Sequence, residues 1–303
     1  MKKITLFLAI TLIFTACKDA AKDNGKLNVV TTTSMITDLV KNIGGDAINV
    51  QGLMGSGVDP HLYKASEGDV TKLVDADIIF FNGLHLEGKL VDVFEKMSSQ
   101  TKTPISLAES LDKSKLIGSE YFASNYDPHV WFDIDFFKEF AKKVTNVLAE
   151  KDPKNAEIFR ENEKHYLTDL DKLKNDIQGV INQLPAEKRI LVTAHDAFNY
   201  FGQAYGFKVV GLQGISTATE AGVQDVQKLA SFIIQYKIKA IFIESSVPKR
   251  TIEALQEAVK SKGHDVIIGG TLYSDALGNP DSLEGTYVGM YRYNIKTIVG
   301  ALN

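Results

Sequence analysis

Short apolar runs rich in β-branched residues recur along the chain, and they alternate with longer stretches in which apolar residues return every three or four positions. Runs that are continuously apolar predict strands buried on both faces, as in parallel sheets covered by helices. The alternation of strand and helix favours βαβ units and predicts an α/β fold with mainly parallel sheets. The predicted strands cover residues 27–32, 48–53, 77–81, 189–193, 207–211, 238–243 and 265–268.

The longest helical pattern lies near the middle of the chain. Asp152 and Pro153 combine an N-cap side chain with a proline at the first helical position, which is a typical helix start. Apolar residues then recur at steps of three and four positions until Pro185. A helix of about 30 residues is about 45 Å long, comparable to the length of a molecule of this size. We expect residues 152–184 to form a stiff spine that joins two α/β lobes; a long helix inside one continuous domain is the alternative.

The first residues have the layout of a secretory signal. Two lysines precede an apolar run from Ile4 to Phe14, and small residues then lead into Cys17. This run of 11 residues is too short to cross a hydrocarbon core of about 30 Å as a helix. Cys17 is the only cysteine, and its position resembles that of a lipobox, in which the cysteine is lipidated and becomes the first mature residue. An incidental cysteine is the alternative, since Phe14 stands where a lipobox usually has leucine.

The remaining chain is long enough for two lobes of about 120–150 residues each. We expect a signal peptide with its lipobox cysteine, a polar tether, an N-terminal lobe, a spine helix and a C-terminal lobe, at residues 1–17, 18–26, 27–151, 152–184 and 185–303. The chain is 44% apolar and 24% charged, as is typical of a folded soluble protein. Its 38 acidic and 34 basic residues are interspersed without a basic cluster, which argues against a nucleic-acid partner. A monomer is expected.

Two of the six histidines, His61 and His129, each end the tripeptide Asp-Pro-His. Proline fixes φ and biases the residue before it to an extended form, so each histidine is held on a stiff turn. Asp59 and Asp127 stand two residues earlier and could accept the second ring N–H, which would fix the tautomer and raise the basicity of the imidazole. The repetition favours metal ligands over ordinary surface histidines.

Two further candidate ligands, His195 and Asp275, lie beyond the carboxyl ends of predicted strands, where open α/β sheets bind their ligands. Asp275 follows a glycine-containing stretch, so a helix cap is the alternative for this residue. Three imidazoles and one carboxylate suit Zn²⁺, and they suit Mn²⁺ if the carboxylate binds through both oxygens.

The other histidines and two further carboxylates are weaker candidates. His165 lies among polar residues of the predicted spine, and His264 follows a glycine in a turn, so neither is expected to bind metal. For His85 we expect packing or contact with the metal ligands. For Glu220 and Glu244 we expect capping or structural hydrogen bonds, with contact to the metal ligands as the alternative.

Several segments of this sequence resemble the substrate-binding lipoproteins of zinc and manganese ABC transporters, within the helical-backbone metal receptors. They follow the family order across nearly all of the mature chain: GVDPHLYKAS (57–66), ADIIFFNGLHLEG (76–88), DPHVWFD (127–133), TAHDAFNYFGQAYG (193–206), GISTATEAG (214–222), IFIESSV (241–247), TLYSDALG (271–278) and TYVGMYRYN (286–294). The resemblance implies two α/β lobes joined by a spine helix, with a metal in the cleft between them. It also implies that the metal ligands are His61, His129, His195 and Asp275.

The resemblance bears on the cargo as well. Members of the family have histidine or glutamate at the position of His195. Zinc-specialised members often carry a histidine-rich loop before their second ligand, whereas residues 107–126 contain no histidine. This weakens a zinc-only interpretation without establishing manganese, and Fe²⁺ is a further candidate.

The function implied by the resemblance is capture of Zn²⁺ or Mn²⁺ outside the cytoplasm and delivery to an ABC permease with its ATPase subunit, without enzymatic activity. The protein would be a lipoprotein anchored in the periplasm or on the outer face of the cytoplasmic membrane. A surface adhesin stabilised by metal and a receptor for chelated iron are alternatives, although a compact site disfavours a bulky chelate. A zinc hydrolase would need an open coordination position, and the sequence lacks a His-Glu-x-x-His motif.

Overall fold

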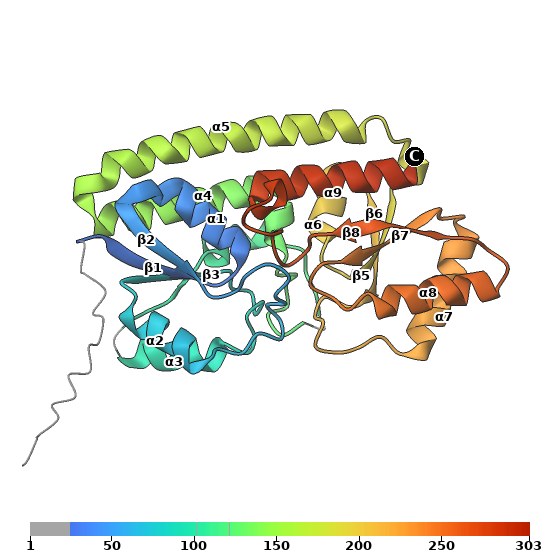
Figure 1. The fold of residues 1–303 in the computed structure, drawn as a ribbon, viewed down its shortest axis with the longest axis horizontal. Helices are drawn as coiled ribbons and strands as arrows, with labels where there is room; N and C mark the ends of the chain where they lie inside the picture. The colour runs from blue at the N-terminus through green and yellow to red at the C-terminus, as the bar shows by residue number, and fades with distance from the viewer. Residues whose placement is uncertain (1–24, 101, 121) are drawn as a thin grey trace, which may run out of the picture.

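The computed structural model describes residues 25–100, 102–120 and 122–303 of the 303-residue chain. The predicted signal peptide, Cys17 and most of the predicted tether lie outside the described residues. Figure 1 shows two α/β lobes side by side, with long helices across both. The predicted two-lobed α/β fold with parallel sheets is therefore confirmed. Within the described ranges, none of the helices has both the length and the apolar character needed to cross a membrane.

The N-terminal lobe contains a parallel sheet with strand order β2-β1-β3-β4. Its strands are β1 (Leu27–Thr31), β2 (Ile48–Gly52), β3 (Ile78–Phe81) and β4 (Ile105–Ser106). The sequence did not predict β4, because a strand of two residues carries no periodic pattern. The helices of this lobe are α1 (Ser34–Gly44), α2 (Glu67–Asp75), α3 (Val91–Gln100) and α4 (Ile134–Lys151).

In the C-terminal lobe, strand β5 (Ile190–His195) pairs in parallel with β6 (Lys208–Gln213), and β7 (Ala240–Glu244) pairs in parallel with β8 (Ile267–Leu272). The first strand of each pair also packs against the other, so these strands form one layer. The helices are α6 (Asn199–Tyr205), α7 (Val223–Gln235), α8 (Arg250–Ser261) and α9 (Tyr287–Leu302). Short 3₁₀ turns occur in both lobes at Gly45–Ala47, Ala108–Ser110, Lys113–Lys115, Val130–Phe132, Pro153–Asn155, Ala186–Lys188 and Leu283–Gly285.

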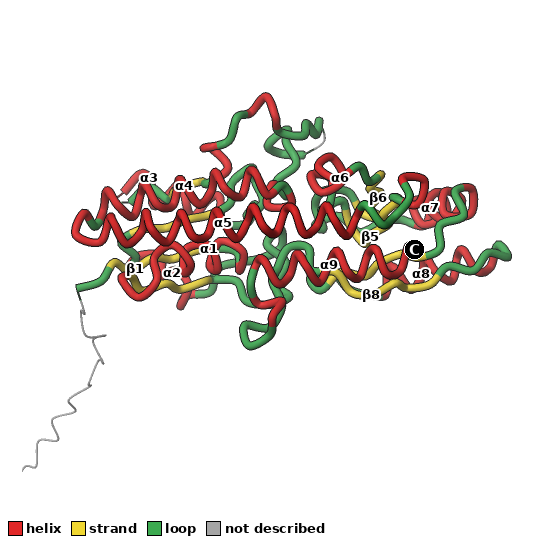
Figure 2. Tube along the Cα trace, turned by 90° about the horizontal axis from the view of Figure 1, so that it is seen from above, coloured by secondary structure: helices red, strands yellow, loops and turns green. Residues whose placement is uncertain are grey.

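The predicted spine is helix α5 (Ala156–Ile181), whose 26 residues make it about 39 Å long. It is shorter than predicted at both ends, because Pro153 begins a 3₁₀ turn and the last residues before Pro185 leave the helix. Figure 2 shows α5 passing from the N-terminal lobe over the start of the C-terminal lobe. It packs on α1, α4 and α9 through its buried face, which comprises Phe159, Tyr166, Leu170, Leu173, Ile177 and Ile181.

The two lobes share one hydrophobic core beneath α5. The largest cluster of buried apolar residues combines side chains from α1, α4 and α5 with others from β5, α6 and α9. Across it, the rings of Phe137 on α4 and Tyr287 on α9 stack with their centroids 3.9 Å apart. The hydroxyls of Tyr287 and Tyr291 donate to the carbonyl oxygens of Trp131 and Phe132, both at 2.6 Å. A wide hinge motion would have to break this packing, so the lobes are held at a nearly fixed angle.

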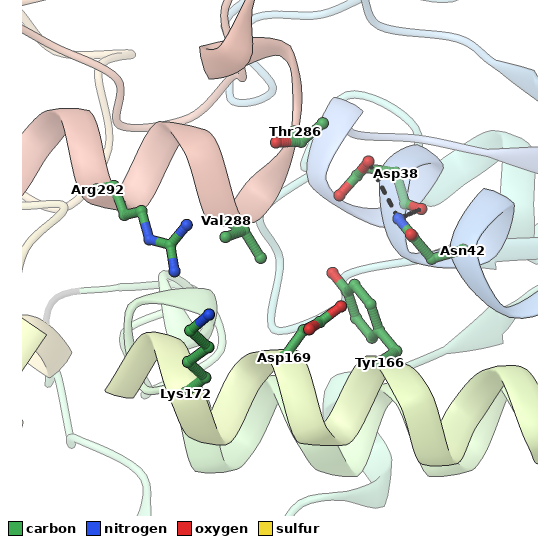
Figure 3. A pocket seen from close by; sticks show the side chains of 8 residues that line it. All are labelled: Asp38, Asn42, Tyr166, Asp169, Lys172, Thr286, Val288 and Arg292. Carbon is green, nitrogen blue, oxygen red and sulfur yellow. Dashed lines mark hydrogen bonds between the residues drawn. The ribbon is translucent and has the colours of Figure 1, made fainter. Parts of the chain in front are cut away.

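Helices α1, α5 and α9 also surround a polar cavity of about 340 Å³. Figure 3 shows the lining side chains: Asp38, Asn42, Tyr166, Asp169, Lys172, Thr286, Val288 and Arg292. Asp38 Oδ2 accepts the backbone N–H of Tyr287 at 3.0 Å, at the N-terminus of α9 where a negative charge is favourable. Burial nevertheless raises the pKa of Asp38 to about 6, because the carboxylate is largely removed from water.

This shift predicts how Asp38 affects stability as the pH changes. An aspartate in an unfolded chain titrates near pH 4, so between about pH 4 and 6 the folded protein binds the extra proton. Asp38 therefore costs more stability as the pH rises through this window. Asp38→Asn keeps an oxygen acceptor but has no proton to lose. The free energy of unfolding of this variant, relative to that of wild type, should therefore increase by about 1–3 kcal/mol as the pH rises from 4 to 7.

Urea unfolding of both proteins at several pH values measures this difference. Asp169→Asn is the matched control. Asp169 lines the same cavity, but it is exposed and accepts no hydrogen bond from α9 among the described residues. A difference between Asp38→Asn and wild type that stays constant from pH 4 to pH 7 would contradict the prediction.

Candidate metal centre

Four buried polar side chains from distant parts of the chain meet where the two lobes adjoin. Among the described residues, His61, His129, His195 and Asp275 each offer one ligand atom, and these atoms all lie within 4.8 Å of one another. None of the four residues is more than 4% exposed. The two Nε2 atoms of His61 and His129 are 3.3 Å apart. Asp275 Oδ1 lies 3.6 Å from His129 Nε2, and Asp275 Oδ2 lies 3.2 Å from His195 Nε2.

These spacings match those expected around one metal ion. A tetrahedral site with metal–ligand distances of about 2.0–2.1 Å places neighbouring ligand atoms about 3.3–3.4 Å apart. The three separations above lie close to this value. The cluster can therefore accept a single divalent transition metal ion bound by three imidazoles and one carboxylate.

The two Asp-Pro-His turns place His61 and His129 in the N-terminal lobe in different ways. Asp59 Oδ1 accepts the backbone N–H of His61 at 2.8 Å. Asp127 Oδ1 accepts the equivalent N–H of His129 at 2.9 Å and also lies 2.7 Å from its ring Nδ1. The predicted contact between carboxylate and imidazole is therefore present at Asp127, whereas Asp59 binds the backbone of its histidine. The second oxygen of Asp59 accepts from Thr217 Oγ1 of the other lobe at 2.6 Å.

His195 and Asp275 come from the carboxyl ends of strands, but the strands extend further than predicted. His195 is the last residue of β5 and does not follow it. Strand β8 continues through Gly269 and Gly270 to Leu272, with an irregular register opposite β7. Glycine is needed here because a Cβ at Gly269 would lie 2.7 Å from the ring of Phe242, and Gly270 has a φ of +145°. Asp275 consequently stands in the loop after the strand, and the helix-cap alternative for Asp275 is wrong.

Glu244, at the end of β7, supports His195. Its Oε1 accepts the backbone N–H of His195 at 2.8 Å, and its Oε2 lies 2.6 Å from His195 Nδ1, without the alignment of a directed hydrogen bond. Burial would lower the pKa of His195, but the carboxylates of Glu244 and Asp275 raise it well above its usual range. Burial lowers the pKa of His61 to about 3, so that ring is neutral as a metal ligand must be.

Several buried polar atoms of the cluster are not satisfied by the protein. Oδ1 of Asp275 has no hydrogen-bond partner among the described residues, and the ring nitrogens of His195 face carboxylate oxygens of Glu244 and Asp275 without a directed hydrogen bond. Buried polar atoms of folded proteins are nearly always paired, because an unpaired one costs free energy. The carboxylates of Asp127, Glu244 and Asp275 also lie within the cluster or directly against it. A divalent cation would satisfy Nε2 of His195 and Oδ1 of Asp275 and offset the negative charge, whereas Nδ1 of His195 stays against Glu244.

The remaining candidates lie elsewhere. His85 is exposed, with a φ of +63°, and packs edge-on against Phe122, whose ring in turn contacts His61. Glu220 is exposed and pairs with Arg250 at 3.3 Å. His165 is exposed on α5, and His264 lies in the turn after α8.

Contacts between the lobes hold the candidate ligands in place, and sequence reasoning missed these contacts. Asn199 Nδ2 donates to Asp127 Oδ2 at 3.0 Å, and the hydroxyl of Tyr200 donates to the carbonyl of Asp127, also at 3.0 Å. The indole N–H of Trp131 donates to the carbonyl of Ser274 at 3.0 Å, directly before Asp275. These partners are 72 to 143 residues apart in sequence, so no local pattern could have indicated them.

Comparison with known proteins finds close relatives along almost the whole chain. Residues 29–301 match the model of the family described as "Zinc-uptake complex component A periplasmic". The chain is 50% identical over 285 residues to "Zinc-binding protein TroA" of Treponema pallidum (strain Nichols), covering 94% of this chain and 91% of that protein. It is 47% identical over 298 residues to "Manganese-binding lipoprotein MntA" of Bacillus subtilis (strain 168), covering 97% of each.

The fold likewise matches a solved structure. The periplasmic zinc-binding protein TroA from Treponema pallidum superposes with a TM-score of 0.89 at 49% sequence identity, over 92% of this chain and 99% of that one. The resemblance inferred from the sequence motifs is therefore confirmed at the level of both sequence and fold.

Proposed function

This chain belongs to the family of periplasmic zinc-uptake complex component A, and we propose that it captures a divalent transition metal outside the cytoplasm and delivers it to the permease of an ABC importer. The observation that carries this proposal is the buried cluster of three imidazoles and one carboxylate, whose spacing fits one ion. The relatives named as zinc-binding and manganese-binding proteins support the same cargo class.

The metal ligands in this proposal are His61, His129, His195 and Asp275. Two imidazoles from the N-terminal lobe and two groups from the C-terminal lobe bind the ion, so cargo ties the lobes together. A given set of nitrogen and oxygen ligands binds Zn²⁺ more tightly than Mn²⁺ or Fe²⁺. Preference for Mn²⁺ would require the site to enforce a larger coordination shell, with both oxygens of Asp275 on the ion.

Release follows from the same geometry. Because the lobes share a core, a permease does not need to open the protein widely. Metal–ligand distances must stay within about 0.2 Å of their ideal values for tight binding. A small displacement of the loops that carry His61 and Asp275 would therefore be enough to weaken these bonds. The permease, acting with its ATPase subunit, would thus unload cargo by distorting the loops.

Catalysis is not favoured by this site. A catalytic zinc keeps a coordination position open for water or substrate, whereas here four candidate ligands surround the ion and all are buried. A protein in which metal only stabilises the fold is also disfavoured, because the shared core under α5 provides packing that does not involve the ligands. In this proposal the protein acts as a monomeric receptor that is anchored to a membrane through lipidated Cys17.

The first test is titration of metal-stripped protein lacking residues 1–17 with Zn²⁺ and Mn²⁺, by calorimetry and by competition with a chelator. We expect one tightly bound equivalent on protein that is already folded without metal. His61→Ala, His129→Ala, His195→Ala and Asp275→Ala should each weaken binding at least 100-fold, since each removes a ligand.

His165→Ala and His264→Ala are the controls and should change the affinity by no more than about threefold. Weak binding by wild type, or equal losses in the control variants, would refute the ligand assignment. A protein that is unfolded without metal would instead indicate a structural metal site.

The two Asp-Pro-His turns allow a finer comparison. Asp127 contacts the ring of His129, so Asp127→Asn should lower metal affinity about 10–100-fold by weakening the orientation and basicity of that imidazole. Asp59→Asn should cost less, because Asp59 accepts hydrogen bonds from the backbone of His61 and from Thr217 but none from an imidazole ring. The same titration measures both, and a larger loss for Asp59→Asn would contradict the prediction.

The lipid anchor is tested by Cys17→Ser in the full-length chain. A serine cannot form the thioether of a lipobox cysteine, so the variant should leave the membrane fraction while wild type remains in it. Western blots of membrane and soluble fractions measure this distribution. Continued membrane association of Cys17→Ser at wild-type levels would exclude lipidation as the anchor.

A further inference from the structure

Helix α1 of the N-terminal lobe holds the segment that carries Asp275. Ser34 and Asp38 stand four residues apart on α1 and so lie on the same helix face. Ser34 Oγ accepts the backbone N–H of Leu277 at 2.8 Å, two residues after Asp275. Asp38 Oδ2 accepts the N–H of Tyr287 at 3.0 Å, where α9 begins. One helix face therefore binds both ends of the segment 277–287.

The segment between these two anchor points is compact, so a shift at one end moves the other end with it. The N–H of Gly278 donates to the carbonyl of Glu284 at 2.8 Å. A Cβ at Gly278 would lie 2.7 Å from Glu284 Cβ, and one at Gly285 would lie 2.3 Å from the carbonyl oxygen of Asn279. The backbone on the two sides of the loop is thus in contact, which leaves little room for the segment to deform.

Asp275 itself lies between two contacts with the N-terminal lobe. On one side, the carbonyl of Ser274 accepts the indole N–H of Trp131 at 3.0 Å. On the other side, the N–H of Leu277 donates to Ser34. The same lobe supplies His61 and His129, so Ser34 links the carboxylate of one lobe to the imidazoles of the other.

The side chain of Asp275 is less constrained than its backbone. Its oxygens face the imidazoles of His195 at 3.2 Å and His129 at 3.6 Å, which are themselves candidate ligands of the ion. The other side-chain contact of the carboxylate among the described residues is the long one from Oδ2 to Ser246 Oγ at 3.5 Å. Whether one or both oxygens reach an ion therefore depends on where the backbone of this segment stands. A tetrahedral Zn²⁺ site needs one oxygen, whereas Mn²⁺ favours a larger, oxygen-rich shell.

We propose that Ser34, assisted by Asp38, is a positioning residue that sets the approach of the Asp275 carboxylate and thereby the ratio of Mn²⁺ affinity to Zn²⁺ affinity. This inference rests on the proposed function of the His61, His129, His195 and Asp275 site. Loss of the Ser34 contact frees the segment to shift. Zn²⁺ still draws in a single oxygen, but Mn²⁺ loses the second one.

The experiment measures Zn²⁺ and Mn²⁺ dissociation constants for wild type, Ser34→Ala and Asp38→Ala by chelator competition at neutral pH. Ser34→Ala should weaken Mn²⁺ binding about 10–100-fold and Zn²⁺ binding no more than about threefold. Asp38→Ala should shift the ratio in the same direction by a smaller factor, because its contact lies further from Asp275. Ser34→Thr and Asp38→Asn keep an oxygen acceptor, so both variants should retain the wild-type ratio of Mn²⁺ affinity to Zn²⁺ affinity.

Matched controls separate positioning from general loss of stability. Asp169→Ala removes the other carboxylate of the cavity in Figure 3. Ser231→Ala removes an exposed serine whose hydroxyl donates to Gln227 within α7 and accepts from Lys262, far from the candidate site. Neither variant should alter the ratio. An unchanged ratio in Ser34→Ala, or equal losses for both ions, would overturn the inference while leaving the proposed function intact. Failure of wild type to bind either ion would overturn the proposed function, and this inference with it.

Discussion

The meeting of imidazoles and carboxylates at one buried point is the constraint on which the rest of this structure depends. Among the described residues, Oδ1 of Asp275 has no hydrogen-bond partner and the ring of His195 meets two carboxylates without a directed hydrogen bond, and a buried polar atom left unpaired costs about 1–3 kcal/mol. A flexible protein would relieve this cost by letting the side chains turn toward water or toward one another. The surrounding structure must therefore be stiff enough to prevent that collapse.

The stiffness comes from the way the lobes are joined. Each lobe has its own smaller cluster of apolar side chains under α2 and α3 or under α7 and α8, but the largest cluster belongs to both lobes. Helix α5 covers this shared core, and the hydroxyls of Tyr287 and Tyr291 cross it to reach the backbone around Trp131. Support for the candidate ligands also crosses between lobes, through Asn199, Thr217 and Ser34. The site is thus a property of the joint between the lobes, and neither lobe contains it by itself.

The sequence predicted the fold class, the main strands and the long helix, because each carries a local pattern. It placed His61 and His129 on stiff turns for the same reason, since Asp-Pro-His is a local signal. It offered contact with a metal ligand for Glu244 only as the alternative, because the contact of Glu244 with His195 depends on two strands lying side by side. It did not predict the extension of β8 through two glycines. Asn199, Thr217 and Ser34 have no distinctive local pattern either. Their contacts arise from the packing of distant segments, and a single sequence does not encode those distances in any readable periodicity.

Trp131 has a consequence of a different kind. It is the only tryptophan of the chain, it is 2% exposed, and its ring centroid lies 5.3 Å from that of His129. Its indole N–H is bonded to the backbone of the opposite lobe, beside Asp275. When excited at wavelengths that its 11 tyrosines do not absorb, the emission of this protein therefore comes from one indole at the joint between the lobes, with no second indole to dilute the signal. The molecule carries a native optical probe of that joint, so that its state can be followed in real time without attaching a dye.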